Sequence, residues 1–118
     1  MGRLSTHVLD IQSGMPAAGV AADLLEIRTD GSARLVKSVR TNADGRTDQP
    51  LLAGAEMSAG VFELRFHAGD YFRAKGEALP EPPFIDIVPI RFGVADVNVH
   101  YHVPLLVSPW AYSTYRGS

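Results

Sequence analysis

Asp96-Val97-Asn98-Val99-His100-Tyr101-His102-Val103 alternates strictly between polar and apolar side chains. Successive side chains of a β-strand point to opposite faces of a sheet, so this alternation predicts a half-buried strand. Its inner face would carry the valines and the tyrosine. Its outer face would be polar and would present Asp96, Asn98, His100 and His102.

Further strands are expected on both sides of this segment. Val61–His67 alternates in the same way, with apolar residues opposite charged ones. The other candidates are residues 4–10, 21–28, 33–41, 84–92 and 105–115, the last interrupted at Pro109. Turn sequences such as Asp30-Gly31-Ser32 separate these runs at short intervals. Seven or eight short strands at such spacing favour an antiparallel β-sandwich.

A single short helix is expected after the Val61–His67 strand. Asp70 is a suitable N-cap for the residues 71–75, and Gly76 is a suitable stop. No internal repeat or linker interrupts the chain, so residues 1–118 are expected to form one domain.

Composition excludes several classes of protein. With 46% hydrophobic and 20% charged residues the chain is not of the disordered type. Its net charge of -2 argues against nucleic-acid binding, and the absence of cysteine excludes disulfides, thiol nucleophiles and thiolate metal sites. No apolar run approaches the about 20 residues that span a bilayer, and the N-terminus has no run of signal-peptide type. A cytoplasmic protein without membrane partners is therefore expected.

Four histidines are candidates for chemistry. His100 and His102 would project from one face of their strand, about 6.6 Å apart along its axis. Such a pair could bind zinc only with further ligands, and two polar residues on a solvent-facing strand explain the pattern equally well. His67 is expected on the surface, whereas the alternation around His7 is ambiguous.

Two further segments stand out. Asp44-Gly45 favours a tight turn with positive φ, which would place Arg46 at the start of a returning strand. An isolated arginine there is usually solvated. The C-terminal segment 112–118 is rich in tyrosine and hydroxyl residues, and a specific reason would be needed to hold such a tail in a sheet.

Four separated motifs resemble the 5-hydroxyisourate hydrolases of the transthyretin-related family. They are Leu4-Ser5-Thr6-His7-Val8-Leu9-Asp10, Asn42-Ala43-Asp44-Gly45-Arg46, His100-Tyr101-His102-Val103-Pro104-Leu105-Leu106 and Tyr112-Ser113-Thr114-Tyr115-Arg116-Gly117-Ser118. The resemblance runs from Leu4 to Ser118. The Tyr-Arg-Gly-Ser ending discriminates best, because transthyretin proper, the hormone carrier of this fold, lacks it. Trp110-Ala111 departs from the family pattern of Tyr or Phe followed by Gly. The resemblance therefore does not fix the width of the family's active-site channel in this protein.

The resemblance implies a fold, an assembly and a reaction. The fold would be an all-β, transthyretin-like sandwich of two four-stranded antiparallel sheets with one short helix. The assembly would be a homotetramer, a dimer of dimers, with active sites in a channel at the dimer-dimer interface. The reaction would be hydrolysis of 5-hydroxyisourate to 2-oxo-4-hydroxy-4-carboxy-5-ureidoimidazoline in urate degradation. It would need no metal and no organic cofactor.

Site residues also follow from the resemblance. The catalytic residues would be His7, Arg46, His102 and Ser118. The substrate would be bound by these four residues together with Tyr115, Arg116 and Gly117, whereas a role for His100 is less clear. A neutral imidazole can take a proton from water, and a guanidinium can stabilise negative charge on a carbonyl oxygen.

Two alternatives stay open from the sequence. The first is a transthyretin-like protein whose channel binds a small aromatic ligand without catalysis. The second is a metal site built on His100 and His102. A carrier would not require His7, Arg46, His102 and the Tyr115–Ser118 ending together, and this favours the hydrolase.

Overall fold

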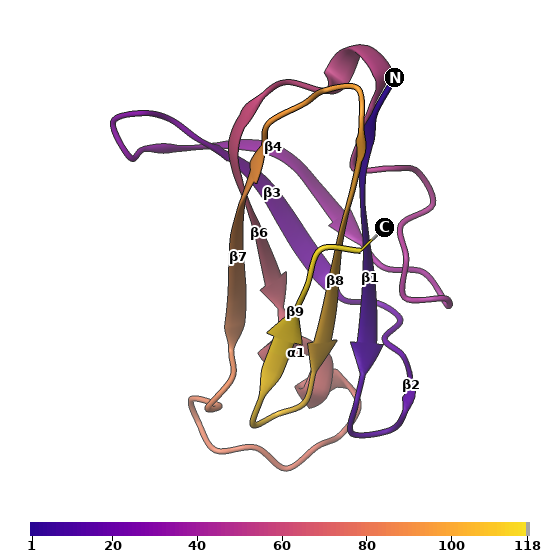
Figure 1. Ribbon diagram of the computed structural model, residues 1–118. Coiled ribbons are helices and arrows are strands. Elements are labelled where there is room, and N and C mark those ends of the chain that lie inside the picture. The colour runs from indigo at the N-terminus through magenta and orange to yellow at the C-terminus, as the bar shows by residue number, and fades with distance from the viewer. Residues whose placement is uncertain (118) are drawn as a thin grey trace.

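The computed structural model describes residues 1–117, so Ser118, which the resemblance places in the catalytic set, lies outside the described residues. Residues 1–117 form nine strands, a 3-10 turn and one α-helix (Figure 1). The strands are β1 (Arg3–Asp10), β2 (Met15–Pro16), β3 (Ala21–Ile27), β4 (Ala33–Arg40), β5 (Leu52–Ala53), β6 (Gly60–His67), β7 (Ile87–Val94), β8 (His100–Val107) and β9 (Tyr112–Thr114). The 3-10 turn η1 covers Gly54–Glu56, and the helix α1 covers Ala68–Ala74.

The strands form two sheets, as the predicted sandwich requires. One sheet has the order β2-β1-β8-β9, with the short β5 also paired to β1, and the other has the order β4-β3-β6-β7. The all-β class with one short helix is therefore confirmed. The pair β1 and β8 is parallel, whereas all other pairs are antiparallel. A parallel pair needs a long crossover connection, and here the second sheet lies in the chain between the two strands.

The hydrophobic core lies between the two layers that Figure 1 shows. Every second residue of β1 points inward, as the burial of Leu4, Thr6 and Val8 shows. In β6 the inward positions are aromatic and aliphatic and include Phe62 and Phe66. The strict alternation along β1 leaves its other face free for polar side chains.

The predicted strand at 96–103 is only half correct. Strand β8 begins at His100, and residues 97–99 form a turn. The Asp96 carboxylate accepts a hydrogen bond from the Asn98 backbone N–H at 2.9 Å, which stabilises this turn against an extended chain. Val97 and Val99 still pack against the core. Asp96 and Asn98 therefore do not continue the polar face of the strand.

The helix also begins earlier than expected. It starts at Ala68 and has His67 at the N-cap, so Asp70 lies in the first turn, where it pairs with Arg73 at 2.8 Å. Gly69, although a glycine usually weakens a helix, lies inside it, and its N–H donates to the Asp86 carbonyl at 2.9 Å. A Cβ at residue 69 would approach the Asp86 carboxylate to 2.6 Å, so a glycine is required there. The predicted stop at Gly76 agrees with its φ of 86°.

Other boundaries differ by a few residues. The predicted strands at 21–28 and 33–41 agree with β3 and β4 to within one residue, whereas β7 begins at Ile87 rather than at residue 84. The strand expected at 105–115 is divided into the end of β8 and β9. The Ser108 hydroxyl accepts hydrogen bonds from the N–H groups of Trp110 and Ala111 and so closes the connecting turn. No helix of residues 1–117 is long and apolar enough to cross a membrane.

Candidate active site

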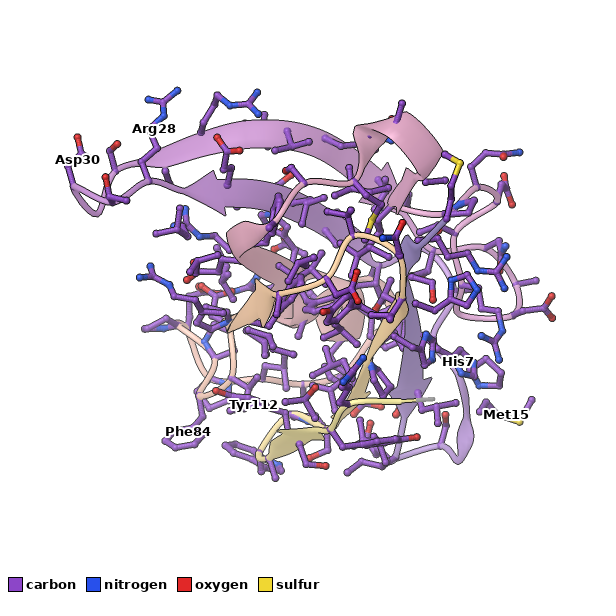
Figure 2. The ribbon with its side chains drawn as sticks, turned by 45° about the horizontal axis from the view of Figure 1, so that its top comes forward. His7, Met15, Arg28, Asp30, Phe84 and Tyr112 are labelled. Carbon is purple, nitrogen blue, oxygen red and sulfur yellow. The ribbon has the colours of Figure 1, made fainter. Side chains whose placement is uncertain are left out.

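The candidate site lies on the outer face of β1 and β8. Arg3, Ser5 and His7 alternate with the inward residues of β1, so they share this face. Figure 2 shows His7 on the side of β1 that points away from the space between the sheets. The parallel register pairs Ser5 with His102. His7 is two residues further along β1, which puts its Cα roughly 8 Å from that of His102.

The imidazole of His102 has neighbours on two sides. Its Nδ1 lies 2.8 Å from the Ser5 hydroxyl oxygen, in a half-buried position. On the other side the C-terminal tail returns along β8, and the Gly117 backbone N–H donates to the His102 carbonyl at 2.8 Å. A Cβ at residue 117 would lie 2.5 Å from the imidazole Cδ2, so any residue larger than glycine would require the ring or the tail to move. The C-terminal tail is therefore held in the sheet, and its contact with β8 at His102 is one reason.

Arg46 reaches the same face from the loop between β4 and β5. The Asn42 side chain accepts hydrogen bonds from the N–H groups of Asp44 and Arg46 and so folds the loop tightly. Gly45 has a φ of 75°, as the Asp-Gly pair predicts. Arg46 does not start a returning strand, however, because the chain stays irregular until β5. The loop is fastened to β1 instead, since the Gly45 carbonyl accepts from the Val8 N–H at 2.8 Å.

His7 contacts this loop directly. Its Nε2 donates to the Asp44 carbonyl at 2.9 Å. A carbonyl oxygen can only accept, so the Nε2 of His7 carries a proton and, in the neutral ring, Nδ1 carries the lone pair. The ambiguity of His7 in the sequence is thereby resolved: it belongs to the outer face, beside Arg46.

A surface depression lies between Arg46 and His102, and His7 is not among the residues that line it. One part, of about 300 Å³, is lined by Arg3, Ser5, Arg46, His100 and His102. A second part, of about 310 Å³, shares Arg3, Ser5 and Arg46 with the first and extends along the loop to Asp48. The depression therefore combines imidazole bases, guanidinium groups and a hydroxyl on one polar surface.

The electrostatics of the depression act on His102. Partial burial lowers the pKa of His102, and the neighbouring Arg46 and His7 lower that pKa further. Both effects disfavour the imidazolium. His102 is therefore neutral near pH 7 and able to accept a proton.

The tail residues have different neighbours. Tyr115 and Arg116 line another depression, of about 240 Å³, together with residues of β7 such as Phe92. The Arg116 guanidinium stacks on the Tyr101 ring at 4.6 Å, and it also donates to the His100 carbonyl at 3.4 Å. Gly117, by contrast, contacts His102. Within one chain the predicted binding set is thus divided between two surfaces.

The remaining histidines are placed as follows. His100 is exposed at the rim of the depression. His67 is half-buried on the other sheet and contacts the Asp23 carboxylate at 3.0 Å, so it is less free than a surface residue. In the part of the chain that the structure describes, no three His, Cys, Asp or Glu side chains are placed to hold a metal ion.

Ser5 and Arg3 are the site residues that the sequence did not single out. Ser5 contacts His102 and lines both parts of the depression, and Arg3 lines both parts as well. The alternation of β1 could have found them, because it puts both residues on the face of His7. Their contact with β8 could not be read from the alternation, since it depends on the parallel register.

The fold and the polar face define the class of protein: a transthyretin-like β-sandwich with a histidine and arginine site on the outside of one sheet. The chain belongs to the HIUase/Transthyretin family, whose family model matches residues 4–117. The resemblance carried by the four sequence motifs is therefore confirmed.

Two relatives illustrate the similarity in sequence. A 5-hydroxyisourate hydrolase of Mesorhizobium japonicum is 64% identical over 118 residues, which cover 99% of this chain and 93% of that protein. A protein named 5-hydroxyisourate hydrolase 2, from Rhizobium meliloti, is 58% identical over 118 residues and covers 99% of this chain and 97% of its own.

Three solved structures share the fold. An (S)-allantoin synthase has a TM-score of 0.93 and 45% identity, with 99% of this chain covered, and this chain spans 44% of that longer chain. The 5-hydroxyisourate hydrolase of Klebsiella pneumoniae has a TM-score of 0.80 and 34% identity, with 100% of both chains covered. Sea bream transthyretin in complex with thyroxine has a TM-score of 0.87 and 27% identity, covering 98% of this chain and 94% of its own.

Proposed function

We propose that this protein hydrolyses 5-hydroxyisourate to 2-oxo-4-hydroxy-4-carboxy-5-ureidoimidazoline in urate degradation. The observation that carries the proposal is the convergence of His7, Arg46 and His102 on one polar face from three separate segments of the chain. The names of the relatives from Mesorhizobium japonicum and Rhizobium meliloti support the same reaction.

The reaction opens the six-membered ring at its acyl C–N bond. A water oxygen bonds to the carbonyl carbon while an imidazole takes one of the protons of that water. His102 is suited to this step because it is neutral near pH 7, and a general base of this kind contributes about 10² to 10⁴ in rate. The C–N bond then breaks, the imidazolium gives its proton to the ring nitrogen, and the carbonyl becomes a carboxylic acid, which releases its own proton to water to form the carboxylate.

Arg46 and His7 have separate roles in this proposal. The Arg46 guanidinium offers two fixed donors to the oxygen on which negative charge develops. His7, with its Nε2 on the Asp44 carbonyl, presents Nδ1 to substrate or water and shares the proton transfer. Ser118, Tyr115, Arg116 and Gly117 are proposed to complete the substrate site, and no metal or organic cofactor takes part.

The assembly and location extend the proposal. We propose a homotetramer, a dimer of dimers, in which the depression lines a channel between dimers and the tail residues of a neighbouring copy come close to it. The whole chain, residues 1–118, is taken as one domain, and its location as cytoplasmic. Light scattering should give four times the chain mass of 12.8 kDa. A monomer with full activity would contradict the channel.

Urate oxidase tests the activity by supplying the substrate. It converts urate to 5-hydroxyisourate in the cuvette, and the decay of the ultraviolet absorption is followed with and without the protein. Faster decay, with the ring-opened product identified by ¹³C NMR, is the expected result. A folded protein that leaves the decay unchanged would contradict the proposal.

The similarity to a thyroxine complex favours a second candidate, a binding protein without catalysis. In that case the channel would hold an aromatic ligand and the imidazoles would only contact it. Calorimetric titration with thyroxine distinguishes the two candidates. Micromolar binding of thyroxine together with no hydrolysis would support the carrier, whereas hydrolysis without such binding supports the enzyme.

A further inference from the structure

The contact between Ser5 and His102 joins two strands that are far apart in the sequence. Ser5 lies on β1 and His102 lies on β8, and the parallel register makes them direct neighbours. The hydroxyl oxygen and the imidazole Nδ1 are 2.8 Å apart. Both residues are half-buried, so solvent competes only in part for this hydrogen bond.

The orientation of the ring follows from its two neighbours. The Nδ1 edge faces β1 through Ser5, and the Cδ2 edge faces the tail, where a Cβ on Gly117 would come within 2.5 Å of it. Because both edges are confined, the ring is held between β1 and the tail. Its second nitrogen, Nε2, is next to Cδ2 and therefore lies away from Ser5.

The tautomer of the ring depends on the charges around it. Those on the surrounding elements are Arg3 and His7 on β1, Arg46, Asp44 and Asp48 in the loop, His100 on β8, and Arg116 in the tail. Of Arg46 and His7, which both lower the pKa of His102, the Arg46 guanidinium carries the permanent positive charge. The Ser5 hydroxyl oxygen is 2.8 Å from Nδ1 and can accept a proton from that nitrogen, whereas Nε2 lies on the side of the ring away from Ser5. A proton on Nδ1 therefore has an acceptor, and the lone pair is then on Nε2.

We propose that Ser5 is a positioning residue for the hydrolysis: its hydroxyl oxygen accepts the Nδ1–H of His102 and so leaves the Nε2 lone pair free to take the proton from water. The inference rests on the proposed function. When Nε2 takes that proton, the water oxygen forms the new C–O bond. Nε2 later returns the proton to the nitrogen of the broken C–N bond, so His102 ends neutral. Ser5 accepts from Nδ1 throughout, since an imidazolium donates from both nitrogens.

The tautomer can be measured without any assay of activity. Nitrogen chemical shifts of ¹⁵N-histidine distinguish a protonated nitrogen from one with a lone pair, and His102→Gln identifies the signals of His102. In the wild-type protein at pH 8 we expect the proton on Nδ1. In Ser5→Ala the proton should move in part to Nε2. A wild-type ring with its proton on Nε2 would overturn the inference even if the protein is an active hydrolase.

Kinetics give the second readout. Ser5→Ala is expected to lower kcat by about 10- to 100-fold with KM changed less than about twofold, because it alters the base and not substrate binding. Ser5→Thr keeps the hydroxyl and should retain kcat within about threefold, since strands tolerate β-branched residues. Ser38→Ala is the matched control. It removes a serine that donates to the Asp23 carboxylate at 2.7 Å on the other sheet, and it should leave kcat unchanged.

The outcomes separate the inference from the proposed function. Equal kcat in wild type and Ser5→Ala would overturn the role of Ser5 and leave the hydrolase intact. A wild type without activity would contradict the proposed function, while the nitrogen shifts would still report the tautomer. A Ser5→Ala variant that loses kcat but keeps the Nδ1–H tautomer would also overturn the inference.

Discussion

The Nε2 of His7 donates a hydrogen bond to the backbone carbonyl of Asp44 at 2.9 Å, and this contact ties the first strand to the loop that carries Arg46. The partner is a backbone group in a loop that the Asn42 side chain already folds tightly. The imidazole and the guanidinium are therefore positioned by one rigid element.

Gly45 is the position where the loop touches β1. A Cβ there would lie 2.4 Å from the Val8 carbonyl oxygen, and the residue has a φ of 75°. Gly45→Ala should therefore lower the free energy of unfolding by about 3 kcal/mol or more and reduce kcat/KM at the same time. Gly31→Ala has the same backbone strain with nothing within 4 Å, so it should cost about 1 kcal/mol and leave kcat/KM unchanged. Urea unfolding measures the free energy of unfolding, and the ultraviolet assay measures kcat/KM. Equal effects of the two variants would show that the contact of Gly45 with β1 does not matter.

Arg46 should act on the pH profile as well as on the rate. The pKa of His102 is lowered below 6.5 by burial, Arg46 and His7, so kcat/KM should fall only as the pH drops through this lowered pKa. Arg46→Gln removes one positive charge and should move the acid limb toward higher pH. Arg46→Lys keeps the charge and should leave the limb in place.

Both Arg46 variants should lose about 100-fold or more in kcat, because neither offers two fixed donors. The position of the acid limb of the pH profile thus separates the effect of the Arg46 charge from the effect of its two donor groups. An identical limb in the two variants would show that Arg46 does not act on the base through its charge.

Gly117 tests the contact between the tail and His102. Gly117→Ala introduces a Cβ 2.5 Å from the imidazole Cδ2, so the tail must move away and kcat should fall by about 10-fold or more. The melting temperature should change little, since the site is at the end of the chain. Gly93→Ala, where a Cβ meets nothing within 4 Å, is the control and should keep full activity. Full activity of Gly117→Ala would show that the tail does not confine His102.

Asp10 should dominate the acid stability of the fold. Its buried carboxylate accepts hydrogen bonds from Tyr71 on α1, from Lys75 directly after α1 and from the Ser13 backbone. Burial alone would raise the pKa of Asp10, but these bonds outweigh burial and the pKa is lowered below 3.8. A lowered pKa means that the stabilisation is complete well above 3.8 and is lost as the pH falls through the folded-state pKa.

Asp10→Asn should accordingly lower the free energy of unfolding by about 3 kcal/mol at pH 7, since it leaves Lys75 without its partner. The melting temperature of this variant should also depend less on pH below about pH 5 than that of the wild type. Asp30→Asn in an exposed turn is the control and should melt close to wild type. Parallel pH profiles of wild type and Asp10→Asn would contradict this account.

The sequence predicted the parts of the fold that depend on alternation. Strands β1, β3, β4 and β6 agree with their predicted ranges, because a strand with one buried face has a period of two that sequence reveals directly. The predicted boundaries that were wrong are those where a local side-chain or backbone contact overrides the pattern of the sequence. The Asp96 carboxylate accepts a backbone hydrogen bond that closes a turn within an alternating stretch. Gly69 lies inside the helix although glycine is an unfavourable helix residue, because the neighbouring Asp86 requires a glycine there and accepts a hydrogen bond from its N–H.

The sequence motifs predicted which residues form the site, but not which of them contact one another. The motifs indicated His7, Arg46 and His102, which the structure brings to one face. The parallel pairing that puts Ser5 next to His102 depends on a register between segments 97 residues apart, which no local pattern contains. The placement of Tyr115 and Arg116 beside β7 could not be foreseen for the same reason.

The most direct test of the whole account is the decay of 5-hydroxyisourate with wild type and His102→Ala side by side. The substrate is produced from urate by urate oxidase, and the ultraviolet absorption is followed at pH 7.5 against a sample without protein. We predict rapid decay with wild type and a rate lower by about 100-fold or more with a folded His102→Ala, since this variant lacks the base. Equal rates for the two proteins, or no acceleration by folded wild type, would contradict the account.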